Sequence, residues 1–185
     1  PGIDALREQI SLVAGTNAGE VSGDVRKLVK DLGAFPAPLA LNVIPWAGSL
    51  KEDGYTSEEL KVRNESRKIL GMPKLKVSTT CVRVPVLTTH SLAVHATFKK
   101  EVTRKAAQKV LEKAAGVTLL DDPENKKFTT PNDAVGTDAT WVGRVRQSLD
   151  DKKSIDLFLC GDNLRKGAAL NTAQIAELLA VEFTA

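Results

Sequence analysis

Residues 77–98 read VSTTCVRVPVLTTHSLAVHATF, and this stretch predicts two strands joined by a bend. Val77–Val86 is rich in valine and threonine, which favour strands, and His90–Phe98 is the second predicted strand. Arg83 and His90 stand seven residues apart around the bend. A guanidinium holds a carboxylate well through two hydrogen bonds, and an imidazole exchanges a proton near neutral pH. The stretch therefore predicts a carboxylate clamp at Arg83 and a proton-transfer group at His90.

Both side chains also have ordinary structural explanations, which the sequence leaves open. Arg83 could form a structural ion pair or lie exposed on an edge strand. His90 could be a satisfied side chain at the start of a strand. The second histidine, His95, falls on the strand face opposite Leu92 and Val94, and we assign it no role.

The rest of the chain predicts a mixture of helices and strands. Helical periodicity predicts helices at residues 3–14, 25–32, 57–70, 102–114 and 164–181, the third of them opened by a Thr56/Glu59 capping box. Further strands are predicted at residues 39–44, 117–120, 140–146 and 154–159, with loops at 15–23 and 121–138. The strands cluster mid-chain without strict β-α-β alternation, which predicts an α+β fold with a mixed, mostly antiparallel sheet. The last helix has a wide apolar side that includes Ile175 and Leu179, so we expect it to be well buried.

Length, charge and cysteine content limit the function classes. The 185 residues predict a single domain, 1–185, and the small, scattered net charge of +3 argues against a nucleic-acid partner. No apolar run approaches the roughly 20 residues of a membrane span, so we expect no membrane partner. The two cysteines form no disulfide framework and no zinc pattern with the two histidines, so we expect no metal and a cytoplasmic location. The sequence contains no glycine-rich nucleotide-binding loop.

Three further sets of residues could carry chemistry: an ion pair, a loop before the last helix, and the two cysteines. Glu58 and Lys61 share a helix face, either as a solvated ion pair or as groups for an ammonium and a phosphate. The segment 162–167, DNLRKG, opens the last helix, where free backbone N–H groups suit an anion, although Asp162 or Asn163 could simply cap the helix. Cys81 and Cys160 are predicted to be structural thiols, because no helix N-terminus near them would lower a thiol pKa.

Taken together, these motifs resemble the aspartate-β-semialdehyde dehydrogenase family in their order and spacing, from about residue 39 to residue 180. The matching segments are LNVIP (41–45), AGS (47–49), EELK (58–61), ESRKIL (65–70), CVRVPV (81–86), HS (90–91), VGRVR (142–146) and GDNLRKGAA (161–169). The resemblance implies the NADP-dependent reductive dephosphorylation of β-aspartyl phosphate to aspartate semialdehyde and phosphate. This reaction serves lysine (through diaminopimelate), threonine and methionine biosynthesis. It proceeds through a cysteine thioester.

The resemblance also implies roles for individual residues. Arg83 would bind the substrate α-carboxylate, with Glu58 on the substrate amino group and Lys61 on the phosphate. His90 would be the acid/base, and Asn163 would touch the NADP cofactor. The implied fold has helices on one face of the sheet, like the second domain of glyceraldehyde-3-phosphate dehydrogenase. Its sheet would form a homodimer interface.

The sequence also departs from the family pattern. The NADP-binding half is absent, and so is the segment that carries the nucleophilic cysteine. The chain opens on Pro1, so we expect it to be the dimerisation and substrate-binding half of a longer protein, inactive alone. Other readings are a related reductase acting on N-acetylglutamyl phosphate or malonyl-CoA, or a non-catalytic dimerisation module. The 15–23 loop matches the family poorly and has no assigned role.

Overall fold

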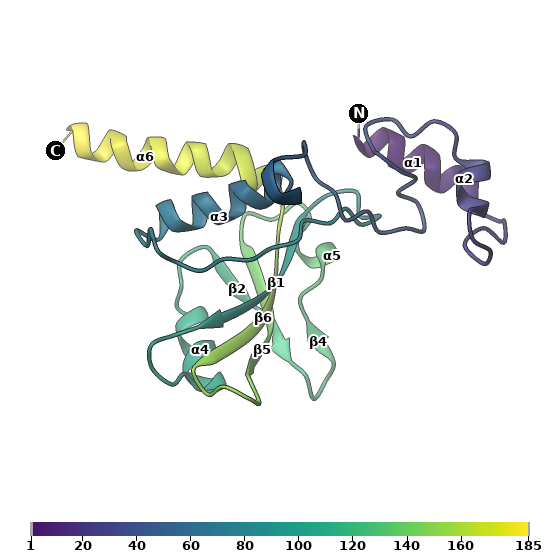
Figure 1. Cartoon of the computed structure of the whole chain (residues 1–185). Coiled ribbons are helices and arrows are strands. Elements are labelled where there is room, and N and C mark those ends of the chain that lie inside the picture. Colours follow the sequence, from purple (N-terminus) through teal and green to yellow (C-terminus); the bar gives the residue numbers. More distant parts are fainter. Residues whose placement is uncertain (1, 185) are drawn as a thin grey trace. The chain divides into compact units, whose positions relative to one another are not determined.

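The computed structural model describes residues 2–184 and divides into two compact units, Pro1–Leu87 and Thr88–Ala185. Figure 1 labels helices and strands of both units. Whether the two units act together as one domain stays a prediction.

The first unit opens with two helices that pack against the chain around residue 40. α1, Gly2–Val13, lies where the apolar periodicity predicts it, and it buries Leu6 and Val13. α2, Asp24–Leu28, ends earlier than predicted because Val29 already has extended backbone angles. Two small apolar clusters hold this part together; one contains Leu6, Leu39 and Ile44, and the other contains Val13, Val29 and Ala40.

The two strands predicted for the first unit are wrong. Residues 39–44 and 77–86 are irregular, apart from one antiparallel bridge between Ile44 and Arg83. In both segments a side chain accepts a hydrogen bond from a backbone N–H group that would otherwise pair with a neighbouring strand. The Gln9 amide oxygen accepts from Leu39 at 2.7 Å, and a Glu59 carboxylate oxygen accepts from Cys81 at 3.0 Å. Both segments also contain or border a proline, which removes a donor.

α3, Ser57–Ile69, confirms the predicted capped helix. Thr56 and Glu59 form the capping box, and the Thr56 N–H donates to the Glu59 carboxylate at 2.8 Å. The 3₁₀ turn η1, Glu52–Gly54, precedes it. Gly48 has a positive φ of 83° and lies directly against the Ser57 hydroxyl, where a larger residue would collide. The turn before α3 therefore requires glycine at this position.

The second unit is built on a four-stranded sheet with the order β1-β6-β5-β2. Its strands are β1 (His90–Thr97), β6 (Ser154–Gly161), β5 (Thr140–Gln147) and β2 (Val117–Leu119). The β1–β6 and β5–β6 pairs are antiparallel, and only β2 runs parallel to its neighbour β5. The predicted α+β fold with a mostly antiparallel sheet is therefore confirmed.

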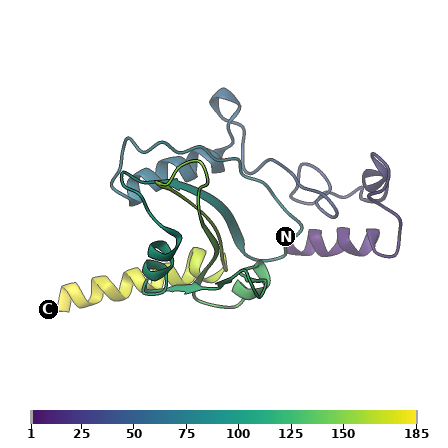
Figure 2. The same ribbon diagram turned by 90° about the horizontal axis from the view of Figure 1, so that it is seen from below.

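One face of this sheet carries the core of the second unit. Val142, Val145 and Ile155 are buried there, and α4 (Arg104–Leu111) packs against them through Ala107 and Leu111. Figure 2 views the strands and α4 from below. A bulge interrupts β5 between Gly143 and Arg146.

The predicted 121–138 loop contains three short elements. These are β3 (Asp121–Asp122), β4 (Lys127–Phe128) and α5 (Pro131–Ala134). Each has four residues or fewer, which is too short to show a hydrophobic period in the sequence.

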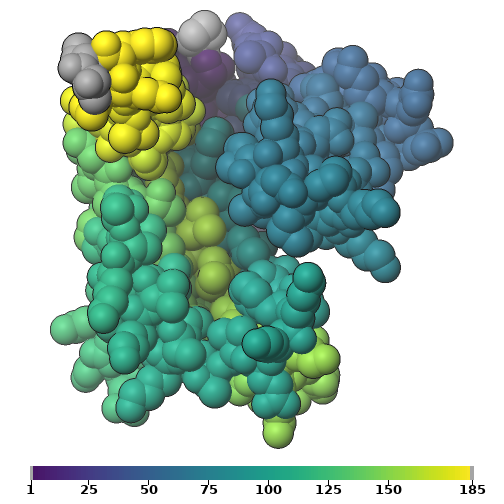
Figure 3. Space-filling model, turned by 90° about the vertical axis from the view of Figure 1, so that its left-hand side faces the viewer, coloured from purple at the N-terminus to yellow at the C-terminus, as the bar shows by residue number. Residues whose placement is uncertain are grey.

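The last predicted helix is present but is not buried. It begins as a π-helical turn, η2 (Arg165–Ala169), and continues as α6 (Leu170–Thr184), which extends away from the sheet of its own unit (Figures 1 and 2). Large apolar side chains along α6 are exposed: Ile175, Leu178, Leu179, Val181 and Phe183. The space-filling view shows α6 end-on, as a yellow block above the green surface of its unit (Figure 3). The expected burial is therefore wrong, because these side chains stay exposed to solvent. No helix among residues 2–184 is long and apolar enough to cross a membrane.

Candidate functional site

Glu59 connects α3 to the segment that carries Arg83. Its carboxylate accepts hydrogen bonds from the backbone N–H groups of Thr56 at 2.8 Å and of Cys81 at 3.0 Å. The Thr56 bond, followed by the Cys81 bond, lowers the pKa of Glu59. The buried carboxylate thus fixes the 81–83 segment against the helix that bears Glu58 and Lys61.

Glu58 and Lys61 form an ion pair on α3. Their side chains meet at 2.6 Å and are 41% and 50% exposed. The hydrogen bond that the Lys61 ammonium donates to the Glu58 carboxylate is the main reason that the pKa of Lys61 is raised. Glu59, next to Glu58 on the same helix, accepts the Cys81 N–H at 3.0 Å, so the pair lies on the helix that is bonded to the 81–83 segment. The pair is open enough for a ligand to exchange with either partner.

The Arg83 backbone is held firmly while its guanidinium remains available. Its N–H donates to the Ile44 carbonyl at 2.8 Å, and its carbonyl accepts from the Ile44 N–H at 3.0 Å. The guanidinium lies 5.8 Å from the centre of the Phe35 ring, within cation–π range. Among residues 2–184 it forms no ion pair and no hydrogen bond with another side chain. A structural ion pair therefore does not account for Arg83, and its planar fork is free for an anion.

His90, in the second unit, is the first residue of β1. It pairs with Gly161 in the β1–β6 ladder, and its side chain is exposed. Thr89, directly before it, has a φ of 102°, a conformation that is strained for a β-branched residue. The Thr89 N–H donates to the Asn163 side-chain oxygen at 2.7 Å. The fold therefore brings His90 and Asn163 together at one end of the sheet.

Asp162, and not Asn163, binds the backbone at the start of the last helix. Its buried carboxylate accepts from the N–H groups of Gly136 and Leu164, both at 2.8 Å, and of Arg165 at 3.2 Å. The Gly136 bond is the main cause of the lowered pKa of Asp162. Asp162 therefore caps the last helix, and Asn163, the other candidate from the sequence, does not.

Neither cysteine has the surroundings of a nucleophile. Burial raises the thiol pKa of both Cys81 and Cys160, against weaker opposing hydrogen bonds. Cys160 is fully buried, with its sulfur 3.3 Å from the Ser91 hydroxyl. A raised pKa leaves less thiolate at neutral pH, so both thiols fit the predicted structural role.

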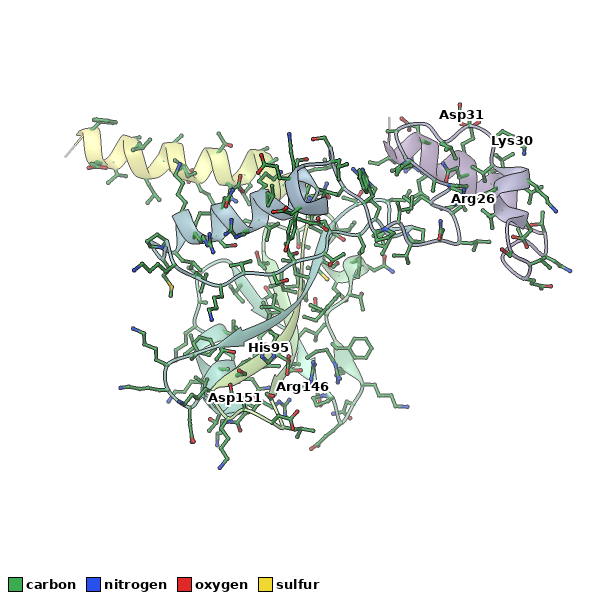
Figure 4. The ribbon with its side chains drawn as sticks, in the orientation of Figure 1. Arg26, Lys30, Asp31, His95, Arg146 and Asp151 are labelled. Carbon is green, nitrogen blue, oxygen red and sulfur yellow. The ribbon has the colours of Figure 1, made fainter. Side chains whose placement is uncertain are left out.

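His95, on the sheet of the second unit, lies in a separate polar cluster. Its Nδ1 atom is 2.9 Å from the Asp156 carboxylate. Figure 4 shows His95 with Arg146 and Asp151 at the end of the sheet formed by β1, β5 and β6. The contact with Asp156 gives the His95 side chain an ordinary surface partner, and we assign it no role.

The sequence did not indicate Thr89, because backbone strain has no signature in a Thr-Thr pair. Of the predicted site residues, Glu58 and Lys61 meet in the first unit, and His90 and Asn163 lie together in the second. That Arg83 and His90 face one pocket stays a prediction. No cluster of three or more His, Cys, Asp or Glu side chains among residues 2–184 could hold a metal ion.

Comparison with known proteins accounts for this arrangement of motifs. A family model described as "Semialdehyde dehydrogenase, dimerisation domain" matches residues 2–166. The chain belongs to this family. The aspartate-semialdehyde dehydrogenase of Corynebacterium melassecola is 50% identical to this dimerisation domain over 182 residues, which are 96% of the chain and 51% of the relative. That of Streptomyces akiyoshiensis is 47% identical over 173 residues, or 88% of the chain and 49% of the relative. The chain spans about half the length of these curated relatives.

Solved structures show the same dimerisation-domain fold. The aspartate semialdehyde dehydrogenase II of Vibrio cholerae, complexed with ASA, superposes with a TM-score of 0.86 at 34% identity, covering 98% of this chain and 50% of that chain. The Candida albicans enzyme with NADP superposes with a TM-score of 0.63 at 20% identity, over 80% of this chain and 47% of its own, and supports the fold alone. The predicted family and fold class are confirmed.

Proposed function

We propose that this chain is the substrate-binding and dimerisation half of an NADP-dependent aspartate-semialdehyde dehydrogenase that works in the cytoplasm. The whole enzyme would convert β-aspartyl phosphate to aspartate semialdehyde and phosphate, for lysine, threonine and methionine biosynthesis. The observation that carries the proposal is 50% identity over 182 residues to a relative of that name.

The first unit supplies charges that suit such a substrate. The Arg83 guanidinium, which forms no ion pair among residues 2–184, would bind the α-carboxylate with two hydrogen bonds. Glu58 would receive the α-ammonium, and Lys61 would receive a phosphate oxygen, each by exchanging its present partner for the ligand. An amino-acid substrate carries both a carboxylate and an ammonium group, which suit Arg83 and Glu58. Malonyl-CoA has no ammonium group, so these two residues together favour the amino-acid substrate.

In the second unit, His90 would move the proton. Its imidazole is exposed to solvent at the start of β1, which would leave it open to a ligand. A proton held at an imidazole nitrogen can be given to, or taken from, an oxygen of the substrate as the carbonyl carbon changes its bonding. Strained residues are typical of functional sites, and Thr89, directly before His90, is strained.

Asn163 is the residue of this chain that fits an NADP contact. Its Oδ1 atom already accepts from the Thr89 N–H, so Nδ2 remains as a donor, with no partner among residues 2–184. A carbonyl oxygen of the cofactor would suit that donor. When bound, NADPH supplies the hydride. The rest of its binding site would belong to the other half of the enzyme.

The proposal predicts that residues 1–185 are inactive alone, because Cys81 and Cys160 are poorly placed as nucleophiles. The test is phosphate-dependent NADP reduction with aspartate semialdehyde. We expect no turnover from the chain alone. We expect turnover from a chimera that joins the N-terminal half of the Corynebacterium melassecola relative to this chain. A folded but inactive chimera would contradict the proposal.

We also propose that the chain forms a homodimer through the sheet of the second unit. The family description, a dimerisation domain, supports this assembly. Sedimentation equilibrium at micromolar concentration should give twice the chain mass of 19.9 kDa. A monomer at all concentrations would refute it.

A further inference from the structure

Thr89 has two features that its local sequence does not require. Its φ of 102° lies in a region that β-branched residues avoid. Its hydroxyl oxygen is buried and has no hydrogen-bond partner among the described residues. Both features cost free energy, so another contact must hold the residue in place.

That contact comes from Asn163, which lies 74 positions later in the sequence. Its side-chain oxygen accepts the Thr89 N–H at 2.7 Å. Asn163 is itself fixed, because it follows β6 and precedes the turn that the buried Asp162 carboxylate holds through three backbone N–H groups. The strained residue is thus attached to a rigid part of the fold.

The position of His90 depends on this attachment. His90 directly follows Thr89 and begins β1, where its ladder partner Gly161 lies two residues before Asn163. Without the Asn163 bond, Thr89 would relax toward a negative φ. That change would rotate the start of β1 and the direction of the His90 side chain.

We infer that Asn163 is a positioning residue, which sets the imidazole of His90 by holding Thr89 in its left-handed conformation. This inference rests on the proposed role of His90 as the proton-transfer group. On this inference the Asn163 side-chain amide has two functions, one for each of its polar atoms. Oδ1 orders the chain, and Nδ2 is left for a ligand.

Three variants of the 185-residue chain separate these functions. Asn163→Asp keeps an acceptor of the same reach, whereas Asn163→Leu keeps the size without an acceptor. Asn163→Ser places a hydroxyl there that is too short to reach the Thr89 N–H. It replaces Asn163→Leu if that variant does not fold, and we expect the same result from it. The readouts are amide hydrogen exchange at Thr89 and the χ1 rotamer populations of His90, both by NMR.

We expect Asn163→Leu to speed exchange of the Thr89 amide by about ten-fold, the loss of one hydrogen bond, and to average the His90 rotamers. Asn163→Asp should retain slow exchange and a single rotamer, a rescue that a packing role would not give. Unchanged exchange and rotamers in Asn163→Leu, or an Asp variant that behaves like the Leu variant, would overturn the inference. Neither readout requires turnover, so the result stands apart from the test of the proposed activity.

Discussion

Glu59 on α3 and Cys81, 22 residues later, are joined by a hydrogen bond from the Cys81 N–H to the Glu59 carboxylate at 3.0 Å. The same carboxylate caps its own helix through the Thr56 N–H. One buried side chain therefore sets both the start of α3, which carries Glu58 and Lys61, and the backbone two residues before Arg83. The groups of the first unit that we propose bind the substrate are therefore held in place by the Glu59 carboxylate, which has no proposed contact with the substrate.

We predict that Glu59 makes stability depend on acid pH. Its pKa is lowered in the folded chain, mainly by the Thr56 N–H, from the 4.5 of a free side chain. Its contribution is therefore complete above about pH 4.5 and is lost as the pH falls through the lower folded pKa. Glu59→Gln should unfold at lower denaturant than the native chain at pH 7, and the difference should shrink at pH 3. A difference that is equal at both pH values would contradict this prediction.

We predict that Gly143→Ala strongly destabilises the second unit. A Cβ at this position in β5 would press on the Leu120 carbonyl oxygen and lie 3.0 Å from the Thr129 N–H nitrogen, both backbone atoms that cannot swing away. Overpacking of this kind costs about 1–3 kcal/mol, measurable by urea unfolding. The matched control is Gly161→Ala in β6, where a Cβ would meet no atom within 4 Å. Equal stability of the two variants would contradict the packing argument.

The helices of this chain could be predicted better than its strands. The apolar spacing of α1 and the Thr56/Glu59 capping box are local signals, and both helices lie where those signals predict. Strands 39–44 and 77–86 failed because Gln9 and Glu59, distant in sequence, take the N–H groups that a ladder would use. The predicted burial of α6 is wrong because large side chains along it, such as Ile175, Leu178 and Phe183, are exposed.

The candidate site was predicted as a set of residue types, while its geometry was not. The Glu58–Lys61 pair follows from helical spacing, and the structure contains it. The bond between Thr89 and Asn163 links residues 74 positions apart and depends on a strained backbone, which no local pattern encodes. The resemblance to a family supplied the roles of single residues, which physical reasoning on the sequence had left open.

Lys61 should matter for phosphate more than for the amino acid. In the chimera with the Corynebacterium melassecola half, Lys61→Ala should raise the KM for phosphate about ten-fold or more, because a charge-assisted hydrogen bond is lost. The KM for aspartate semialdehyde should change by less than about three-fold. The control is Lys68→Ala, in the last turn of the same helix, which should leave both constants unchanged. A uniform effect on both constants would argue against a phosphate role.

Neither thiol of this chain should be needed for turnover. Cys81→Ser and Cys160→Ser in the chimera should each keep kcat within about three-fold, because both thiols have raised pKa values and little thiolate at pH 7. Cys160→Ser should lower the melting temperature, since it places a hydroxyl in a fully buried position. Loss of turnover in Cys81→Ser, with the fold intact, would make Cys81 the nucleophile.

The most direct test of the assignment of Arg83 and His90 is the steady-state kinetics of Arg83→Lys and His90→Asn in the chimera. Arg83→Lys should raise the KM for aspartate semialdehyde by about ten-fold or more, because lysine cannot form the two parallel hydrogen bonds to a carboxylate. His90→Asn should lower kcat by about 100-fold or more with little change in KM, as expected for loss of a general acid/base. If both variants keep kcat and KM within two-fold of the unmodified chimera, these two residues do not form the substrate clamp and the proton-transfer group.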